Sequence, residues 1–435
     1  MPVDDKHLKT RLMAEAEKAI EQLLADRREK EDLTLSDIER FVRAAGQEVM
    51  KRLTGELVEE EAQKPQSRAC PECGKKMRYK GRKERDLVTE TGEVSLERAY
   101  YYCSRCRKGV FPLDRQWGVN ETVYSPELAR QMVWVSGLLP YEQAREVFER
   151  IGHRCIATWS IWTQTQKYGK RLKAYVDHQQ EHVGIERVVL PPPGCDHQER
   201  KGVSMDGGMV NIRDEGWKEF KVGTVFDIDL RLERDPHSHD LVERPHGVNM
   251  AYTAVLGSAD AFRPLMWALA WHCGVPTAAD SSVTADGAEW IWNLAADLFP
   301  DSVGIVDWYH ACEHLAKAAR ALYPEDDQAT QRWFRQRCKD LYKGDIHKIT
   351  LRLDHAGLPE HAHYFHTYRR KMQYQTYLEE GYPIGSGTVE SGVKQFKGRL
   401  TGAGMRWSRQ AAQEMLVIRG AVMAQKFDAL WDAAA

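Results

Sequence analysis

The chain has 435 residues, of which 29% are charged and 42% hydrophobic, and this composition excludes wholesale disorder. A formal net charge of −2 excludes a protein coated in basic residues, so nucleic-acid binding would have to come from local patches. No segment approaches the roughly 20 consecutive apolar residues that cross a bilayer, and no secretion signal is visible, so the nine cysteines predict a reducing, cytoplasmic location.

Residues 1–66 are predicted to form an N-terminal helical region. Apolar residues between positions 6 and 55 recur near a 3.6-residue period, as in amphipathic helices. Ser36 followed by Glu39 resembles a capping box that would open the second of two helices. We interpret this region as a helical bundle or a dimerising hairpin, followed by a polar linker.

Residues 67–120 are predicted to form a zinc ribbon. Two CxxC pairs, Cys70 with Cys73 and Cys103 with Cys106, can each offer two thiolates from a tight turn, and two such turns close a tetrahedral site. Four thiolates leave no open position, so the predicted Zn²⁺ is structural rather than catalytic. Buried or redox-active cysteines are the alternative.

A β-hairpin is predicted between the two pairs. Thr91-Gly92 is typical of a turn, and alternate residues after it fall on one face of a strand, namely Val94, Leu96, Arg98, Tyr100 and Tyr102. From 68 to 109 there are 12 Lys or Arg and 6 Asp or Glu, a local charge of +6. This excess suits contacts with phosphates, and an ordinary solvated basic surface is the alternative.

Residues 121–190 are predicted to hold a helix-turn-helix. Ser125-Pro126-Glu127 is typical of a helix start, and Gly152 separates two further helices. The last helix carries residue types that contact bases and phosphates, namely Ser160, Thr163, Gln164, Gln166, Lys167 and Lys170. A purely structural helical domain is the alternative. Pro191 to Gly194 indicate a linker.

From residue 200 the pattern changes to α/β. Strands are predicted at 203–213, 219–232, 251–256, 282–286 and 303–307. Three leading strands, followed by alternating helix and strand, is the order of an RNase H-like sheet. We therefore predict a multidomain α+β protein: 200–324 form the first part of an RNase H-like core, 325–382 a helical insertion, and 383–435 a core helix and the C-terminal helices.

Three carboxylates lie at the ends of predicted elements. Asp206 and Asp286 each end a strand, and Glu390 lies in the first turn of a helix. Taken singly, each carboxylate has a simpler explanation: a residue of an Asp-Gly turn, a helix cap, or a negative charge stabilised by the helix dipole. Together, their order is that of a nuclease core that binds two Mg²⁺ ions about 4 Å apart at a phosphodiester.

The helix that begins near Glu390 continues into a basic segment. Between Ser391 and Gln410 there are five basic residues and no acidic ones. The residues predicted to contact DNA, through phosphates or by stacking of the indole on a base, are Lys394, Lys397, Arg399, Arg406 and Trp407. A solvated basic face, and core packing of the tryptophan, are the alternatives.

The chain resembles bacterial insertion-sequence transposases of the DDE type and their Mutator-like and hAT-like relatives. The resemblance extends from about Lys201 to Gly420. Their signature of Cys or Asp, two residues and His is matched by Asp307-Trp308-Tyr309-His310, 21 residues after Asp286. Two further segments, Gly385–Ser391 and Gly402–Trp407, also carry the resemblance.

The resemblance implies that Asp206, Asp286 and Glu390 bind the two Mg²⁺ ions, with Asp307 and His310 organising the site. Asp307 also ends a predicted strand and is the alternative second ligand, although the strand order favours Asp286. The implied activity is that of a DNA transposase, which binds insertion-sequence ends and catalyses metal-dependent cleavage and strand transfer. Its expected partners are element ends, target DNA and further copies of itself, with no membrane and no nucleotide cofactor.

Two other functions are consistent with the same residues. One is a non-catalytic DNA-binding protein built from the zinc ribbon and helix-turn-helix. The other is an RNase H-fold nuclease, such as a junction resolvase, that cuts without joining.

Overall fold

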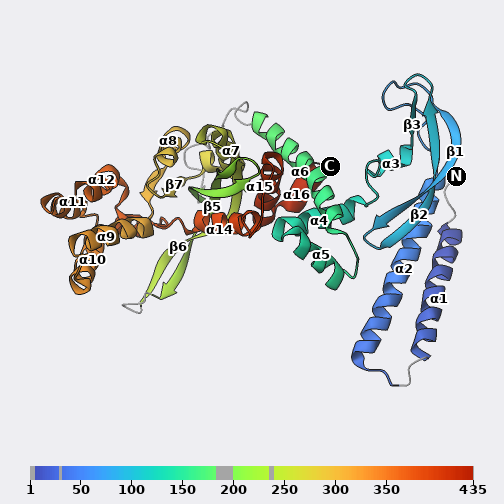
Figure 1. Cartoon of the computed structure of the whole chain (residues 1–435), viewed down its shortest axis with the longest axis horizontal. Helices are drawn as coiled ribbons and strands as arrows, with labels where there is room; N and C mark the ends of the chain where they lie inside the picture. Colours follow the sequence, from blue (N-terminus) through green and yellow to red (C-terminus); the bar gives the residue numbers. More distant parts are fainter. Residues whose placement is uncertain (1–4, 29–31, 183–198, 235–239, 435) are drawn as a thin grey trace. The chain divides into compact units, whose positions relative to one another are not determined.

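The computed structural model describes residues 5–28, 32–182, 199–234 and 240–434. It divides into two compact units, Met1–Met132 and Val133–Ala435 (Figure 1). The predicted linker at Pro191 to Gly194 and the end of the predicted helix-turn-helix region lie outside the described residues.

The first unit begins with two long helices, α1 (Asp5–Arg28) and α2 (Leu35–Gln63). The capping box predicted at Ser36 is wrong by two residues. Thr34 is the N-cap, because it has extended backbone and its hydroxyl accepts the N–H of Asp37, whose carboxylate in turn accepts the N–H of Thr34. Asp37 therefore occupies the position that the sequence had suggested for Glu39.

A three-stranded antiparallel sheet follows, formed by β1 (Arg78–Thr89), β2 (Gly92–Cys103) and β3 (Lys108–Val110). The predicted hairpin is present, but its turn lies one residue earlier than predicted, at Glu90 and Thr91, and Gly92 is the first residue of β2. The predicted single buried face is wrong beyond Arg98, because the pairing of β1 with β2 shifts register between Tyr79 and Arg82. The buried residues after this irregularity are Ala99, Tyr101 and Cys103, whereas Tyr100 and Tyr102 are half-buried.

A buried carboxylate joins the sheet to α3 (Pro112–Gln116). Asp114 is 4% exposed and accepts hydrogen bonds from Arg85 at 2.7 Å and from Arg98 at 2.9 Å. The Arg98 guanidinium also donates to the carbonyls of Lys83 and Glu84. These bonds compensate for removing one negative and two positive groups from water.

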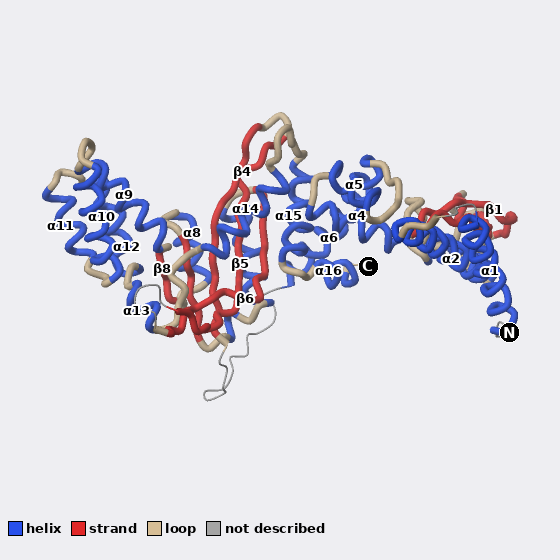
Figure 2. The backbone as a smooth tube through the Cα atoms, turned by 90° about the horizontal axis from the view of Figure 1, so that it is seen from below, coloured by secondary structure: helices blue, strands red, loops and turns tan. Residues whose placement is uncertain are grey.

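The second unit contains a five-stranded mixed sheet in the order β6-β5-β4-β7-β8 (Figure 2). Its strands are β4 (Arg200–Ile212), β5 (Gly216–Arg234), β6 (Leu241–Leu256), β7 (Asp280–Ala285) and β8 (Val303–Val306). β4 pairs antiparallel with β5 and parallel with β7, so it is the central strand. β6 begins ten residues before the predicted start at 251, since its first half pairs with the exposed end of β5, where no buried face imposes an alternating pattern.

Helices cover both faces of this sheet. Val203 and Met205 pack in one core with α7 (Ala259–His272) and α8 (Glu289–Leu298). Because neighbouring residues of a strand point to opposite faces, Asp206 lies on the other face, against which α14 (Gly387–Leu400) packs.

The remaining helices form two groups. α9 (Trp308–Leu322) and the 325–382 segment share a core with β8, and this segment forms α10 (Asp327–Tyr342), α11 (Ile346–His355), α12 (Pro359–Tyr368) and α13 (Tyr374–Glu379). The other group contains α4 (Pro126–Leu138, which spans the division between the units), α5 (Tyr141–Arg150), α6 (Thr158–His182), α15 (Arg409–Met423) and α16 (Phe427–Ala433). Within the described ranges, no helix is both long and apolar enough to cross a membrane.

We predict that Asp114→Ala destabilises the first unit by about 3 kcal/mol, because it leaves the buried guanidinium of Arg98 and the half-buried guanidinium of Arg85 without their carboxylate. Urea unfolding of the zinc-loaded protein measures this loss. Glu93→Ala is the matched control, since Glu93 is an exposed carboxylate on the same sheet. Equal stability of the two variants would contradict the assigned role of Asp114.

Candidate functional site

The predicted catalytic carboxylates come from three separate elements of the second unit. The prediction that Asp206 ends a strand is wrong, because β4 continues to Ile212 through its pairing with β5, and Asp206 lies in its middle. Oδ1 of Asp206 accepts a hydrogen bond from the N–H of Gly207 at 2.6 Å. Burial raises the pKa of Asp206, and the nearby negative charges of Asp286 and Glu390 raise it further, whereas Lys397 opposes them. The three carboxylates are therefore close enough to interact electrostatically.

Asp286 directly follows β7, the parallel neighbour of β4. Its Oδ1 accepts the N–H of Ala288 at 2.8 Å, and its main-chain carbonyl accepts the indole N–H of Trp292 at 2.8 Å. The side chain is half-buried, and Oδ2 has no hydrogen-bond donor among the described residues. Asp286 thus keeps one carboxylate oxygen available for a ligand.

Asp307 follows β8 and is completely buried. Unlike Asp286, it has hydrogen-bond donors from the protein at both carboxylate oxygens. Oδ1 accepts from the backbone N–H of His310 at 2.7 Å and lies 3.2 Å from Nδ1 of the same residue. Oδ2 accepts from the backbone N–H and the hydroxyl of Ser386. Burial alone would raise the pKa of Asp307, but these donors outweigh it and lower the pKa.

Ser386 connects Asp307 to the predicted catalytic glutamate. Its hydroxyl oxygen lies 2.9 Å from Asp307 Oδ2 and 3.1 Å from Glu390 Oε1. The N–H of Trp308 also donates to the carbonyl of Ile384, so the segment before α14 is held against the end of β8. The start of α14, and with it Glu390, is positioned by this network.

His310 lies beside the same carboxylates. Its hydrogen bond to Asp307 raises the pKa of the imidazole to about 9, and the charges of Asp286 and Glu390 add to this effect. Ligand atoms of Asp307, His310 and Glu390 lie within 4.8 Å of one another. Within the described part of the chain, Asp206, Asp286 and Glu390 do not form an equally tight set. Any ion that bridges those three carboxylates would require them to move closer together.

The helical insertion contributes residues that the sequence did not single out. Tyr364 on α12 stacks on His314 with ring centroids 3.7 Å apart, and its buried hydroxyl has no hydrogen-bond partner among the described residues. Burial raises the pKa of Tyr364, and the charges of Asp286 and Asp307 raise it further. Tyr368 donates to the carbonyl of Gly287 at 2.8 Å. The i, i+4 spacing of the two tyrosines was the available sequence signal.

A Cβ added at Gly287 would lie 2.6 Å from the ring of Tyr364, so only glycine permits this close approach. The insertion therefore packs directly against the turn that carries Asp286. This contact gives the segment a structural role at the carboxylates.

The predicted basic face is only partly present. Lys394 and Lys397 are exposed on α14, and Arg406 is exposed in the loop after it. Arg399 and Trp407 depart from the prediction of an exposed DNA-contacting face, because they are 2% and 7% exposed. Arg399 donates through Nε to the carbonyl of Ser136, and the indole N–H of Trp407 donates to the carbonyl of Leu400.

On the predicted recognition helix α6, Gln164 is 4% exposed and is not available to a base edge. Thr163 and Lys170 are exposed, and the other predicted contact residues are half-buried. α6 also packs against α15. Part of the predicted recognition surface is therefore internal.

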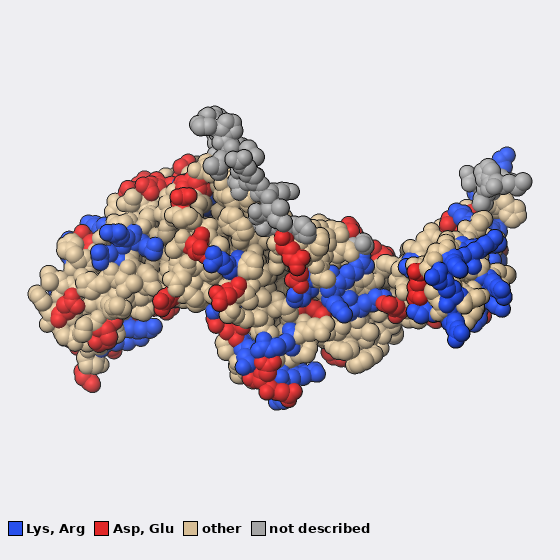
Figure 3. All heavy atoms as spheres, turned by 90° about the horizontal axis from the view of Figure 1, so that it is seen from above, with Lys and Arg blue, Asp and Glu red and all other residues tan. Residues whose placement is uncertain are grey.

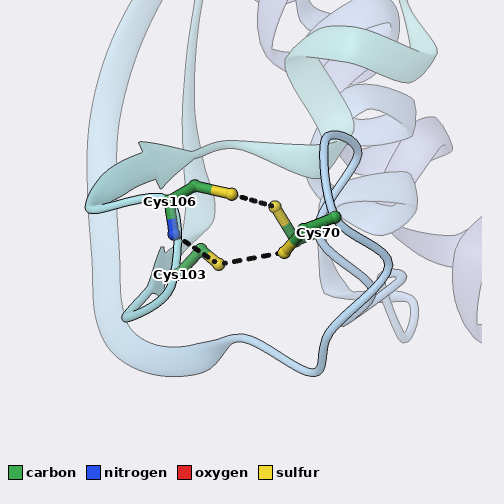
Figure 4. Close-up of side chains that lie close together, drawn as sticks. Cys70, Cys103 and Cys106 are labelled. Carbon is green, nitrogen blue, oxygen red and sulfur yellow. Dashed lines mark hydrogen bonds between the residues drawn. The ribbon is translucent and has the colours of Figure 1, made fainter.

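Four cysteines of the first unit converge on one point (Figure 4). Sγ of Cys70 lies 3.9 Å from that of Cys106, and Sγ of Cys73 lies 3.7 Å from that of Cys103. Four sulfurs at about 2.3 Å from a tetrahedral ion would be about 3.8 Å apart, so the spacing fits Zn²⁺. Backbone N–H groups of Cys73 and Glu72 lower the pKa of Cys70 to about 7, which favours the ligating thiolate.

The segment that carries this cysteine cluster is rich in exposed cations. Ten lysine and arginine side chains between 68 and 109 are exposed, whereas Arg85 and Arg98 face Asp114. Figure 3 shows lysine and arginine side chains gathered over the first unit, at the right of the view. The excess positive charge predicted for this region is therefore accessible to a polyanion.

Removal of the metal tests the cysteine site. We expect about one zinc ion per chain, and we expect Cys103→Ser to lose it and to make the first unit sensitive to protease while the second unit persists. Zinc content and limited proteolysis measure the two effects. Cys155→Ser is the control, because Cys155 is an exposed cysteine of the other unit. Stoichiometric zinc in Cys103→Ser would contradict the assignment.

The His310–Asp307 pair predicts a pH-dependent stability. The pKa of His310 rises from 6.5 to about 9 on folding, so its contribution is complete below pH 6.5 and is lost as the pH rises through about 9. We expect the difference in free energy of unfolding between wild type and His310→Gln, measured by urea unfolding without added divalent metal, to decrease as the pH rises over this range. In an Asp307→Asn background the difference is expected to be small at every pH, and a persistent difference would exclude the pair as its cause.

The chain matches no protein-family model and no curated protein. Its chemistry is therefore inferred from the geometry of the site. Carboxylates that are partly buried beside one another, with oxygens free of protein donors, are suited to binding hard divalent cations.

Proposed function

We propose that the chain is a DNA transposase of the DDE type, which cleaves DNA and transfers strands with the help of divalent metal ions. The observation that carries this proposal is that Asp206 and Asp286 lie at the same level of neighbouring parallel strands, since each comes three residues after the paired Val203 and Val283. Glu390 lies on α14, which packs against β4. Gathering three carboxylates in a partly buried place is unfavourable unless a cation offsets their repulsion. Divalent ions bound by oxygen ligands supply that charge.

The sheet supports an RNase H-like interpretation of the catalytic core. Its order places three antiparallel strands, β6, β5 and β4, beside two parallel strands, β7 and β8. This arrangement has the predicted chain order of three leading strands followed by alternating helix and strand. Asp206 lies in the middle of the central strand but at the level where its parallel neighbour β7 ends, directly before Asp286. The carboxyl ends of parallel strands are where ligands bind in open α/β sheets.

Asp286 is favoured over Asp307 as the second ligand. Asp307 has no oxygen free of protein donors, and ligation of a metal would break its bonds to Ser386 or His310. Asp286 has one oxygen without a donor. We therefore assign metal binding to Asp206, Asp286 and Glu390, and assign Asp307 and His310 to positioning.

The residues of the chain would act as follows. Asp206, Asp286 and Glu390 would hold Mg²⁺ ions, and ions bound there would supply Lewis-acid activation of a hydroxyl nucleophile and stabilisation of the leaving oxygen. Asp307 orients Ser386 by accepting its backbone N–H, and the single hydroxyl proton of Ser386 is shared between Asp307 Oδ2 at 2.9 Å and Glu390 Oε1 at 3.1 Å. Lys394 and Lys397 are exposed on the same helix and neutralise phosphates near the carboxylates.

Binding of the element ends is assigned to the first unit and to α5 and α6 of the second unit. The tetrahedral cysteine spacing supports a zinc ribbon, and the ten exposed cations of the same segment support phosphate contacts. α5 and α6 are the candidates for a helix-turn-helix, with Thr163 and Lys170 the residues exposed to DNA. Joining two ends requires at least two copies of the chain.

Cleavage and joining provide the direct test. We expect purified wild type with Mg²⁺ to nick and join labelled DNA taken from the flanks of its own coding sequence. Asp206→Asn and Asp286→Asn are each expected to lower the rate about 1,000-fold, which corresponds to a loss of about 4 kcal/mol of transition-state stabilisation. Asp301→Asn, an exposed aspartate of the same unit, is the matched control and should retain activity.

The products separate the competing functions. Nicked DNA without joined products would indicate a nuclease of the same fold. Binding without cleavage by wild type, at metal concentrations that saturate the site, would indicate a non-catalytic DNA-binding protein and would contradict the proposal.

A further inference from the structure

A cavity of about 300 Å³ lies in the second unit, away from the carboxylates just described. It is bounded by the start of α5, by α6, by the residue after β4, by the end of α14 and by the loop Gly404–Ser408. This volume is at the lower end of the range for ligand pockets, which suits a single ring system rather than a larger molecule.

A buried arginine lines this cavity without a full set of partners. Arg399 is 2% exposed, and its guanidinium carbon lies 4.9 Å from the ring centre of Tyr141 and 5.1 Å from that of Trp407. Nε donates to Ser136, but Nη2 has no hydrogen-bond acceptor among the described residues. The hydroxyl of Tyr141, also buried and lining the cavity, faces Arg399 and Gln166 but makes no hydrogen bond of normal geometry with a described residue.

Unmatched donors of this kind are costly to bury, and a buried charged donor is the costliest. No carboxylate forms a salt bridge with Arg399 within the described ranges. The cavity therefore offers two donors, one of them cationic, to an acceptor that would enter from outside.

The walls and rim of the cavity restrict what that acceptor is. Trp162 and Trp407 line the wall, and Trp162 stacks on Trp159, whose indole is 70% exposed, with ring centroids 4.4 Å apart. Arg213 and Arg406 line the cavity with exposed side chains, and neither has a salt bridge to a described residue. An anion alone would not need the aromatic walls, and an apolar ligand would not need three arginines.

We propose that this cavity binds one unstacked nucleobase of single-stranded DNA, with Arg399 and Tyr141 donating to acceptors on the edge of the base. The ring packs against the tryptophan walls, and the adjoining phosphates contact Arg213 and Arg406. Guanine fits best, because its N7 and O6 present two neighbouring acceptors.

The position of the cavity connects it to the proposed reaction, and the assignment of DNA as ligand rests on that proposed function. Arg399 lies nine residues after Glu390 on α14, about 14 Å along the helix axis. Lys394 and Lys397 are exposed between them. A strand held by its base in the cavity could thus extend along this helix to the carboxylates, which would fix its register there.

Binding of a short fluorescent oligothymidylate tests the proposal. One probe carries a single internal guanine, and the second has an abasic site at the same position. The full-length protein is used without added divalent metal, so that no cleavage occurs. We expect wild type to bind the guanine probe at least about fivefold more tightly than the abasic probe, as expected for one stacked base.

The variants separate base recognition from phosphate contacts. Tyr141→Phe and Arg399→Lys are expected to reduce the preference for the guanine probe to less than about twofold. Arg213→Ala and Arg406→Ala are expected to weaken both probes equally and to lower the salt dependence. Arg332→Ala, an exposed arginine on α10, is the matched control. Because Arg399→Lys risks misfolding, the conservative Tyr141→Phe variant decides the outcome if the lysine variant is unstable.

Equal affinity of wild type for the two probes, or an unchanged preference in Tyr141→Phe, would overturn the proposal. Competition by dGMP at the same concentration as the guanine probe would also overturn it, because the ligand would then be a free nucleotide. If the protein cleaves DNA but shows no preference for the guanine probe, the assignment of this cavity to a base is wrong and the catalytic proposal is unaffected. A base preference in a protein that never cleaves DNA would reject the catalytic proposal alone.

Discussion

The buried carboxylate of Asp307 is the constraint on which the carboxylate edge of the second unit depends. A carboxylate with no exposed surface is stable only when donors replace its water, and Asp307 has donors from the backbone and side chains of both His310 and Ser386. These bonds join the end of β8, the start of α9 and the start of α14. The hydroxyl of Ser386 also lies within hydrogen-bond distance of Glu390, one helical turn later, so the position of Glu390 depends on the same bonds.

This arrangement explains why the site contains two kinds of acidic residue. Asp307 is saturated with donors and fixes geometry, whereas Asp286 keeps an oxygen free and lies on a turn packed against α12. The helical insertion therefore supports the site although it lies outside the sheet. Its tyrosines pack so closely against Gly287 that a side chain there would displace the insertion or the turn.

Much of the architecture is predictable from local patterns in the sequence. The strands predicted at the positions of β4, β7 and β8 have buried apolar residues. The two CxxC pairs are a strong signal because a tetrahedral zinc site requires four ligands such as these thiolates. Residues that depend on distant partners could not be predicted in this way. The first half of β6 is a strand only because β5 extends to pair with it, and the bulge in β1 changes which residues of β2 are buried.

The residues of the candidate site also fall into those that local sequence patterns predict and those that depend on distant partners. Asp206, Asp286 and Glu390 could be named from their order, and the structure adds that Asp206 and Asp286 lie at the same level of the parallel strands β4 and β7. The sequence could not show that Arg399 turns inward from the basic helix to lie between Tyr141 and Trp407, since that contact joins α5, α14 and the loop that follows it. The pattern of charges in a sequence predicts which side chains attract DNA. The burial of each side chain, which the sequence does not show, decides whether it can contact DNA at the surface or only within a cavity.

Binding of Mn²⁺, followed by isothermal titration calorimetry on wild type, Asp286→Ala and Asp307→Asn, tests the division of roles most directly. We predict that Asp286→Ala loses at least one ion, whereas folded Asp307→Asn keeps the stoichiometry of wild type with weaker affinity, because it removes a positioning group and not a ligand. Loss of an ion in Asp307→Asn together with unchanged binding in Asp286→Ala would contradict the account and would make Asp307 the ligand.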